Sequence, residues 1–170
     1  MEPVEGEAVG STLIDFMMLK HIEDRLKLIE EHLDGDPHYL AEEMLAGRFQ
    51  TVKHSFPHPI VEQFFLDVKG LTGPHSFPEA GIMNSRMAID RAVLKDIFDQ
   101  QINKVFSLID EQLLRAEATY PNTQVSYIIL SGGLGSSDYL CDELKRRYEM
   151  NFGFKSSNTA AIRIVRVADP

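Results

Sequence analysis

The stretch that decides the fold covers residues 125–145 and reads VSYIILSGGLGSSDYLCDELK. Residues 127–130 form a continuous aromatic and aliphatic run, which is typical of a strand covered on both faces in an α/β sheet. Two glycines follow the strand closely, and an amphipathic helix follows the glycines. This order predicts an α/β fold in which the strand lies in the interior.

The glycine turn after this strand predicts a ligand site at the carboxyl end of the strand. Gly132 and Gly133 have no Cβ to obstruct a ligand, and Ser136 or Ser137 can cap the next helix, whose first free N–H groups favour an anion. A purely structural turn explains the same residues equally well. The segment lacks both the third glycine of the dinucleotide fingerprint at its required spacing and the Gly-Lys-Ser/Thr of a P-loop.

The composition excludes several classes of partner. With 170 residues and 44% hydrophobic residues, the chain is long enough for one core, so a single domain is the default. A formal net charge of -9 argues against a nucleic-acid partner, and the basic residues 145–147 are expected to lie on a solvated helix face. The sequence has no run of about 18 apolar residues and an acidic start, so we expect no membrane partner and a cytoplasmic protein.

Neither a disulfide nor a metal site is expected. Cys141 is the only cysteine in the sequence, which excludes an internal disulfide and a cysteine-based zinc site, and we expect it to pack on the apolar face of its helix. His54 and His58 have the spacing of a ligand pair on one helix. Pro57 between them would break that helix, so this pair is not assigned to a metal.

Apolar spacing and helix-breaking residues predict the other elements. Gly47 weakens the second helix, and the first two strands are expected to form a hairpin across a loop rich in Gly and Pro. The predicted helices cover residues 13–33, 38–54, 91–118 and 137–148, and the predicted strands cover residues 60–68, 82–89, 125–130 and 162–167. The abrupt start and end are those expected of a piece of a longer protein.

Several segments together resemble the actin, sugar kinase and heat-shock chaperone ATPase superfamily, most closely the 70-kDa heat-shock protein-like ATPases of fungi. Residues 125–148 resemble its adenosine motif. Residues 10–15 (GSTLID) resemble the Gly-Gly-x-x-Phe-Asp turn that opens a long helix, and residues 49–53 (FQTVK) resemble the helix that lies on adenine and ribose. Residues 87–94 resemble the Ile-Thr-Arg-Ala-x-Phe junction, and Asp169-Pro170 resembles the start of an Asp-Pro-x-x-Ala-Val segment.

The resemblance covers nearly the whole chain and implies the second lobe of an actin-like ATPase fold of the ribonuclease H-like class. Residues 1–36 and 90–170 would form its larger α/β subdomain, and residues 37–89 would form an inserted, smaller α+β subdomain. The first lobe would be missing, together with its phosphate-1 hairpin and the Asp-x-Gly-Gly-Gly-Thr turn expected before Met1. Because phosphoryl transfer needs those groups and a metal, the chain alone is not expected to turn over ATP, and no catalytic residue is assigned.

The resemblance also implies which residues bind ATP or ADP, with magnesium, in the intact parent; the chain alone would require no cofactor. Gly132 and Gly133 would pass under the ribose and α-phosphate, and Gly10 would lie near the phosphates. Lys53 would contact adenosine from the other wall, although a solvent-exposed lysine at a helix end explains this residue as well. His54 stands where the chaperones have Arg. The residues lining the adenosine side would be Leu134, Gly135 and Ser136.

Departures from the family pattern leave other interpretations open. Gln50 and Pro57 replace the usual Glu and Ser, so adenine recognition could be altered or lost. The chain would then be an interaction module, gripped through residues 39–91 by protein clients or nucleotide-exchange partners. An independent Rossmann-like enzyme is a weaker interpretation, since it needs several βα units. Apolar surface left uncovered by the missing lobe would favour self-association.

Overall fold

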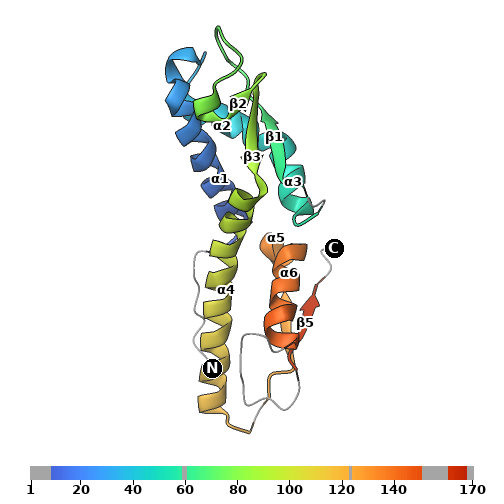
Figure 1. Cartoon of the computed structure of the whole chain (residues 1–170). Helices are drawn as coiled ribbons and strands as arrows, with labels where there is room; N and C mark the ends of the chain where they lie inside the picture. Colours follow the sequence, from blue (N-terminus) through green and yellow to red (C-terminus); the bar gives the residue numbers. More distant parts are fainter. Residues whose placement is uncertain (1–8, 59–60, 123, 151–160, 168–170) are drawn as a thin grey trace. The chain divides into compact units, whose positions relative to one another are not determined.

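The computed structural model describes residues 9–58, 61–122, 124–150 and 161–167 and shows a mixed α/β protein, which confirms the predicted class (Figure 1). The chain divides into two compact units. We call Thr12–Asp99 the hairpin unit, and Met1–Ser11 with Gln100–Pro170 the glycine-turn unit. Helix α4 (Arg91–Thr119) contributes residues to both units, and it closely matches the helix predicted for residues 91–118.

The helices of the hairpin unit follow the predicted pattern, with breaks at identifiable residues. The first continues as a 3-10 segment after Leu26, and Asp36 caps the second by accepting hydrogen bonds from the backbone N–H groups of His38 and Tyr39. Gly47 departs from helical geometry (φ -100°, ψ -121°), as its weak helix propensity predicted. These helical segments are α1 (Ser11–Leu26), η1 (Lys27–His32), α2 (Pro37–Met44), η2 (Leu45–Phe49) and α3 (Gln50–Ser55).

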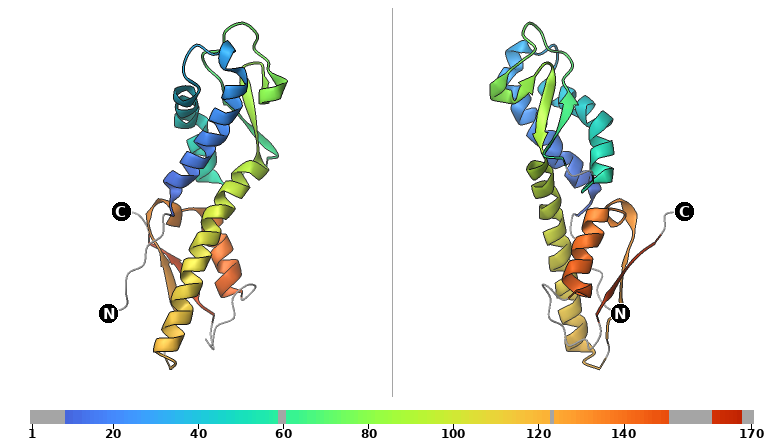
Figure 2. Two further views of the ribbon diagram at one scale, coloured as in Figure 1. Left: turned by 90° about the vertical axis from the view of Figure 1, so that its left-hand side faces the viewer. Right: turned by 45° about the vertical axis from the view of Figure 1, so that its right-hand side comes forward.

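The sheet of the hairpin unit is antiparallel, with strand order β1-β3-β2. Its strands are β1 (Gln63–Asp67), β2 (Ile82–Met83) and β3 (Arg86–Asp90), and the short 3-10 segment η3 (Pro78–Ala80) precedes β2. The pairing of Phe64 with Ile89 and of Leu66 with Met87 confirms that the predicted segments 60–68 and 82–89 pair, but a turn at Asn84 and Ser85 divides the second segment into β2 and β3. All four of these paired side chains are buried, so one face of the sheet forms core. Figures 1 and 2 show α1 and α3 beside this sheet.

Apart from its first residue, Ser11, helix α1 belongs to the hairpin unit, whereas the sequence grouped residues 1–36 with residues 90–170. Its buried stripe includes Ile14, Met18 and Ile22. Arg25 donates hydrogen bonds to the carbonyl oxygens of Ala80 (2.9 Å) and Ala88 (2.7 Å), which ties α1 to the sheet. The amphipathic period predicted the helix, but the element that covers its apolar face is a tertiary property.

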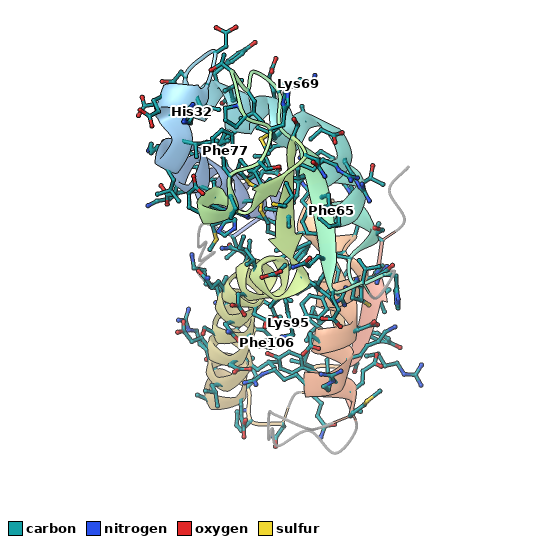
Figure 3. All side chains as sticks on the ribbon, turned by 45° about the horizontal axis from the view of Figure 1, so that its top comes forward. His32, Phe65, Lys69, Phe77, Lys95 and Phe106 are labelled. Atoms are coloured by element: carbon teal, nitrogen blue, oxygen red, sulfur yellow. The ribbon has the colours of Figure 1, made fainter. Side chains whose placement is uncertain are left out.

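The segment after α1 is also held against the hairpin. Leu33 forms an isolated antiparallel bridge with Leu71, and the rings of His32 and Phe77 lie 5.0 Å apart between centroids, as their labelled side chains illustrate in Figure 3. Phe77 is buried. Contacts between residues that are far apart in the sequence therefore hold η1 against the Gly- and Pro-rich loop within the same unit.

An exposed histidine on α2 gives the hairpin unit a pH-dependent contact. His38 Nδ1 lies 3.0 Å from Glu23 Oε2, and this hydrogen bond raises the pKa of His38 and lowers that of Glu23. Folding raises the pKa of His38, so the contact between protonated His38 and Glu23 stabilises the folded state. This stabilisation is complete below the unfolded-state pKa of about 6.5 and is lost as the pH rises through the folded-state pKa of His38.

We therefore expect an NMR titration of His38 to give a pKa above the ordinary value. Glu23→Gln should bring it back towards that value, because the main hydrogen-bond acceptor loses its charge. Glu43→Gln removes an exposed carboxylate from the same helix and is the matched control. An unchanged His38 titration in Glu23→Gln would show that the pair does not form in solution.

The glycine-turn unit contains a parallel pair of strands, β4 (Tyr127–Leu130) and β5 (Arg163–Arg166). Between them lie α5 (Gly132–Gly135), α6 (Asp138–Leu144) and the π-helical segment η4 (Lys145–Glu149), where one continuous helix was predicted for residues 137–148. Cys141 is buried on α6, as predicted. A parallel pair with helices in its connection is a βαβ arrangement.

The prediction that the strand of residues 127–130 is covered on both faces is wrong. Tyr127 and Ile129 are 56% and 65% exposed, whereas Leu130 is buried. Val165, which pairs with Ile129, is also exposed. Successive side chains of a strand point to opposite faces, and within this unit only one face of the pair is packed. A run of apolar residues predicts a strand whose faces would be buried, but it does not indicate whether residues of the same chain bury them.

The sequence predicted that the basic residues 145–147 lie on a solvated helix face, but Arg147 is paired with another helix. Arg147 forms an ion pair with Asp110 of α4, and its guanidinium carbon lies 4.8 Å from the centroid of the Phe106 ring, labelled in Figure 3. The Tyr148 hydroxyl donates to Asp110 Oδ1 at 2.7 Å. Burial, and then this hydrogen bond, raises the pKa of the Tyr148 phenol. One carboxylate therefore joins α4 to η4.

Asp110→Asn is expected to lower the free energy of unfolding by about 1–2 kcal/mol, because it removes the charge that two donors share while leaving an acceptor in place. The side chains of Asp110 and Arg147 are 22% and 25% exposed, so water compensates part of the loss. Urea titration followed by circular dichroism measures it. Glu111→Gln, at an exposed neighbour on the same helix, is the control and should change little; equal effects would exclude a special role for Asp110.

Candidate functional site

The glycine turn has the backbone geometry that only glycine adopts without strain. Gly132 directly follows Ser131 at the carboxyl end of β4 and has φ +78°, in the left-handed region. Gly132 and Gly133 are both exposed. The polypeptide backbone is therefore open to solvent at the point where the sequence predicted a ligand.

The two serines that the sequence offered as helix caps have different roles. Ser137 caps α6, because its hydroxyl accepts a hydrogen bond from the Leu140 N–H at 3.4 Å. Ser136 instead donates its hydroxyl hydrogen bond back to the Gly133 carbonyl at 2.8 Å. Ser136 is exposed and Leu134 is half-buried, so both reach the surface of the turn.

A second predicted segment lies directly beside this turn. A Cβ added at Gly133 would lie 3.0 Å from Ser11 Oγ, a tight contact that the serine hydroxyl would have to relieve by shifting slightly. Gly10 precedes Ser11 and is half-buried. The structure thus brings the Gly10-Ser11 turn and the Gly132-Gly133 turn together, although more than a hundred residues separate them in the sequence. Both belong to the glycine-turn unit.

Gly135, which was predicted to line the adenosine side, lies inside the turn and not at its surface. It is buried, and a Cβ at this position would lie 3.3 Å from the carbonyl carbon of Leu130. A glycine here lets the turn pack closely on the end of β4. The third glycine of the segment therefore supports the turn from inside, and the residues that remain exposed are Gly132, Gly133 and Ser136.

Lys53 is neither a free ligand group nor an exposed lysine at a helix end. Its side chain is 7% exposed, and its Nζ lies 2.7 Å and 2.8 Å from the two carboxylate oxygens of Asp15. Gln50 Nε2 donates to the same carboxylate at 3.1 Å. The alternative of a solvent-exposed lysine is thus wrong, and the charge of Lys53 is already neutralised by α1.

His54 is exposed on α3, and α3 ends at Ser55, so His54 and His58 do not share a helix. Among residues 9–58, 61–122, 124–150 and 161–167, no group of three or more His, Cys, Asp or Glu side chains is arranged to hold a metal ion. The predicted ligand residues fall into both units: Gly10 and residues 132–136 in the glycine-turn unit, Lys53 and His54 in the hairpin unit.

Sequence reasoning missed the partner of Lys53. Asp15 is the last residue of the GSTLID segment, and its distance from Lys53 in the sequence gives no indication of a pair. The acidic residue in a predicted helix opposite a lysine in another helix was the available signal. The Asp169-Pro170 segment lies outside the described residues.

None of the helices in the described part of the chain has the length and apolar character needed to cross a membrane. No family model matches the sequence, and no curated protein or solved structure shows significant similarity to it. The resemblance to the heat-shock chaperone ATPases therefore stays a prediction based on the motifs quoted above.

Proposed function

We propose that this chain forms the adenosine-side wall of an ATP- or ADP-binding cleft in a protein with an actin-like ATPase fold, similar to the heat-shock chaperone ATPases. The observation that carries the proposal is the pair of adjacent turns in the glycine-turn unit. Exposed Gly132 and Gly133 lie at the carboxyl end of a parallel strand, and Ser11 lies against Gly133. In open α/β sheets, ligands bind outside the carboxyl ends of the strands.

Each glycine of the turn contributes for a physical reason. Gly132 adopts a left-handed backbone conformation that favours glycine, and a side chain at Gly133 would crowd Ser11 Oγ. Without side chains, a ribose or a phosphate oxygen can approach the peptide N–H groups closely. The Ser11 and Ser136 hydroxyl groups add polar atoms at the same surface, since Ser11 is half-buried and Ser136 is exposed.

The uncovered face of the β4–β5 pair supports the idea that another lobe completes the domain. Parallel strands are usually covered on both faces, and here Tyr127, Ile129 and Val165 present apolar side chains to solvent. The proposal assigns the groups that hold magnesium and transfer the γ-phosphoryl group to that other lobe. It assigns no ATP turnover to the present chain.

The Asp15–Lys53 pair alters how adenosine would be recognised. A buried lysine that is held by a carboxylate cannot also donate freely to a ribose hydroxyl group without losing that contact. The proposal therefore places the principal nucleotide contacts at Gly10, Gly132, Gly133 and Ser136 and gives Lys53 a structural role. His54, which is exposed, lies in the other unit and is given no contact in the proposal.

The test is a titration of the chain with ADP and magnesium, followed by amide NMR. We expect weak binding, with a dissociation constant on the order of 1 mM, and shifts at Ser11, Gly132 and Gly133. Gly133→Ala should weaken the shifts, because its Cβ would lie 3.0 Å from Ser11 Oγ and displace that hydroxyl group. Gly47→Ala, where a Cβ meets nothing within 4 Å, is the matched control. With the upstream lobe attached, calorimetry should show tight ATP binding; no heat from that longer form would refute the proposal.

A second candidate function is an interaction module that no longer uses a nucleotide. The neutralised Lys53 favours it, and so does the solvent face of the antiparallel sheet, where Phe65 (36% exposed) and Met83 (56% exposed) lie beside Arg86 on one face by register. Phe65 is labelled in Figure 3. A longer form that binds no ATP but retains a purified nucleotide-exchange factor, with loss of retention in Phe65→Ser, would favour this candidate over the first.

A further inference from the structure

The hairpin unit contains a pocket that the nucleotide proposal does not use. It encloses about 270 Å³ between α3, the start of β1 and the start of α4. Phe56, Phe64 and Leu94 are its buried members, each no more than 4% exposed. An apolar cavity of about 150 Å³ suffices to hold a benzene molecule, so this pocket has room for one ring or branched chain with a polar group attached.

The ionisable side chains that line the pocket are all basic. Arg48 and Arg91 line it, together with the exposed His58, and no Asp or Glu does so among the described residues. This is notable in a chain whose formal net charge is -9. The nearest acidic neighbours in the sequence are Glu62 and Asp90, and Asp90 accepts a hydrogen bond from Gln63 Nε2 at 2.6 Å.

A contact with an aromatic ring holds the Arg91 side chain, and no carboxylate of the described residues pairs with its guanidinium group. Its guanidinium carbon lies 4.8 Å from the centroid of the Phe56 ring, and Phe56 stacks on Phe98 with centroids 4.8 Å apart. Within the described residues, neither Arg91 nor Arg48 forms an ion pair with a carboxylate. A guanidinium that stacks on an aromatic ring keeps its N–H groups free to bind a carboxylate in its plane.

We propose that this pocket binds a small apolar carboxylic acid, with its ring or branched chain against Phe56, Phe64 and Leu94 and its carboxylate at the arginines. The apolar floor supplies affinity, and the arginines select an anion over a neutral analogue of the same shape. A free acid with one ring fits a pocket of about 270 Å³, whereas a longer polypeptide would extend beyond it. The site is independent of the glycine turn, since it lies wholly within Thr12–Asp99.

The experiment titrates the full chain with 3-phenylpropionate up to about 10 mM, the range expected for so small a ligand, and follows backbone amides by NMR. We expect saturable shifts at Thr51, Val52 and Ser55, all of which line the pocket. The neutral amide of the same acid should bind at least about fivefold more weakly, because it cannot form the charge-assisted hydrogen bonds. This comparison requires no variant and so does not depend on how a mutant folds.

Variants locate the anion contact. Arg91→Gln and Arg48→Gln should each weaken binding of 3-phenylpropionate at least about threefold. Arg86→Gln is the matched control, because Arg86 also stacks on a phenylalanine, Phe65, at 5.5 Å but lies outside the pocket. Equal binding of acid and amide, or absence of shifts at the pocket residues, would overturn the proposal. Tighter binding of a tripeptide ending in Phe than of the free acid would overturn the assignment to a small acid.

Discussion

Replacing Phe64 with alanine is expected to lower the free energy of unfolding of the hairpin unit by about 3 kcal/mol. Phe64 is 4% exposed and pairs in the sheet with the fully buried Ile89. Removing the ring loses its transfer free energy and leaves a void that rigid neighbours fill only partly. Because the ring already borders the pocket on one side, the loss should fall at the lower end of the range for buried phenylalanines.

Phe65→Ala is the matched control for Phe64→Ala. It changes the same residue type one position further along β1, where the side chain is 36% exposed and meets the Arg86 guanidinium. The loss should be less than about 1 kcal/mol. Since the chain has no tryptophan, urea titrations should be followed by circular dichroism or amide NMR. Equal losses would mean that β1 does not present Phe64 to the core, which contradicts the register described above.

Replacing Asp15 with alanine is expected to lower the free energy of unfolding by about 2–3 kcal/mol. The change leaves the ammonium group of Lys53, whose side chain is 7% exposed, without its carboxylate partner. A buried charge without a partner costs more than the pair contributes, because it keeps its desolvation penalty. The side chain of Asp15 is 30% exposed, so water reaches the site and the loss stays below that of a fully buried pair.

A double-mutant cycle separates this pair from its surroundings. Lys53→Met preserves the apolar stem and removes the charge, so the double variant Asp15→Ala/Lys53→Met should be more stable than Asp15→Ala alone. Additive effects would show that the two groups are not coupled in solution. They would also return Lys53 to the nucleotide site, because an uncoupled lysine is available to a ligand. The cycle therefore tests the structural role that the proposed function assigns to Lys53.

Local patterns predicted most of the elements of this chain. The spacing of apolar residues located both ends of α4 and the start of α1 to within two residues. The predicted end of the first helix falls after the 3-10 segment that continues α1 beyond Leu26. The weak point at Gly47 and the hairpin between β1 and β3 were also predictable. These features depend on backbone preferences and on side-chain spacing within short segments, which are written directly in the sequence.

The candidate site was only partly predictable. Gly132 and Gly133 could be selected from their place between a strand and a helix. The contact of Ser11 with Gly133 could not be predicted, because it depends on the tertiary packing of two segments that are distant in the sequence. The inward position of Gly135 and the pairing of Lys53 with Asp15 were likewise missed. Both are contacts between separate elements, and residue type alone does not reveal them.

By itself the sequence determined where most of the helices and strands form, that a glycine turn follows the strand at residues 127–130, and that the chain carries a net negative charge. Only the tertiary structure decided which side chains meet: Lys53 with Asp15, Arg147 with Asp110, and the arginines with the pocket beside Phe56. The physical reason is one of range. Backbone preferences and periodicity act over a few residues, whereas burial and charge pairing depend on segments that packing brings together from distant parts of the chain.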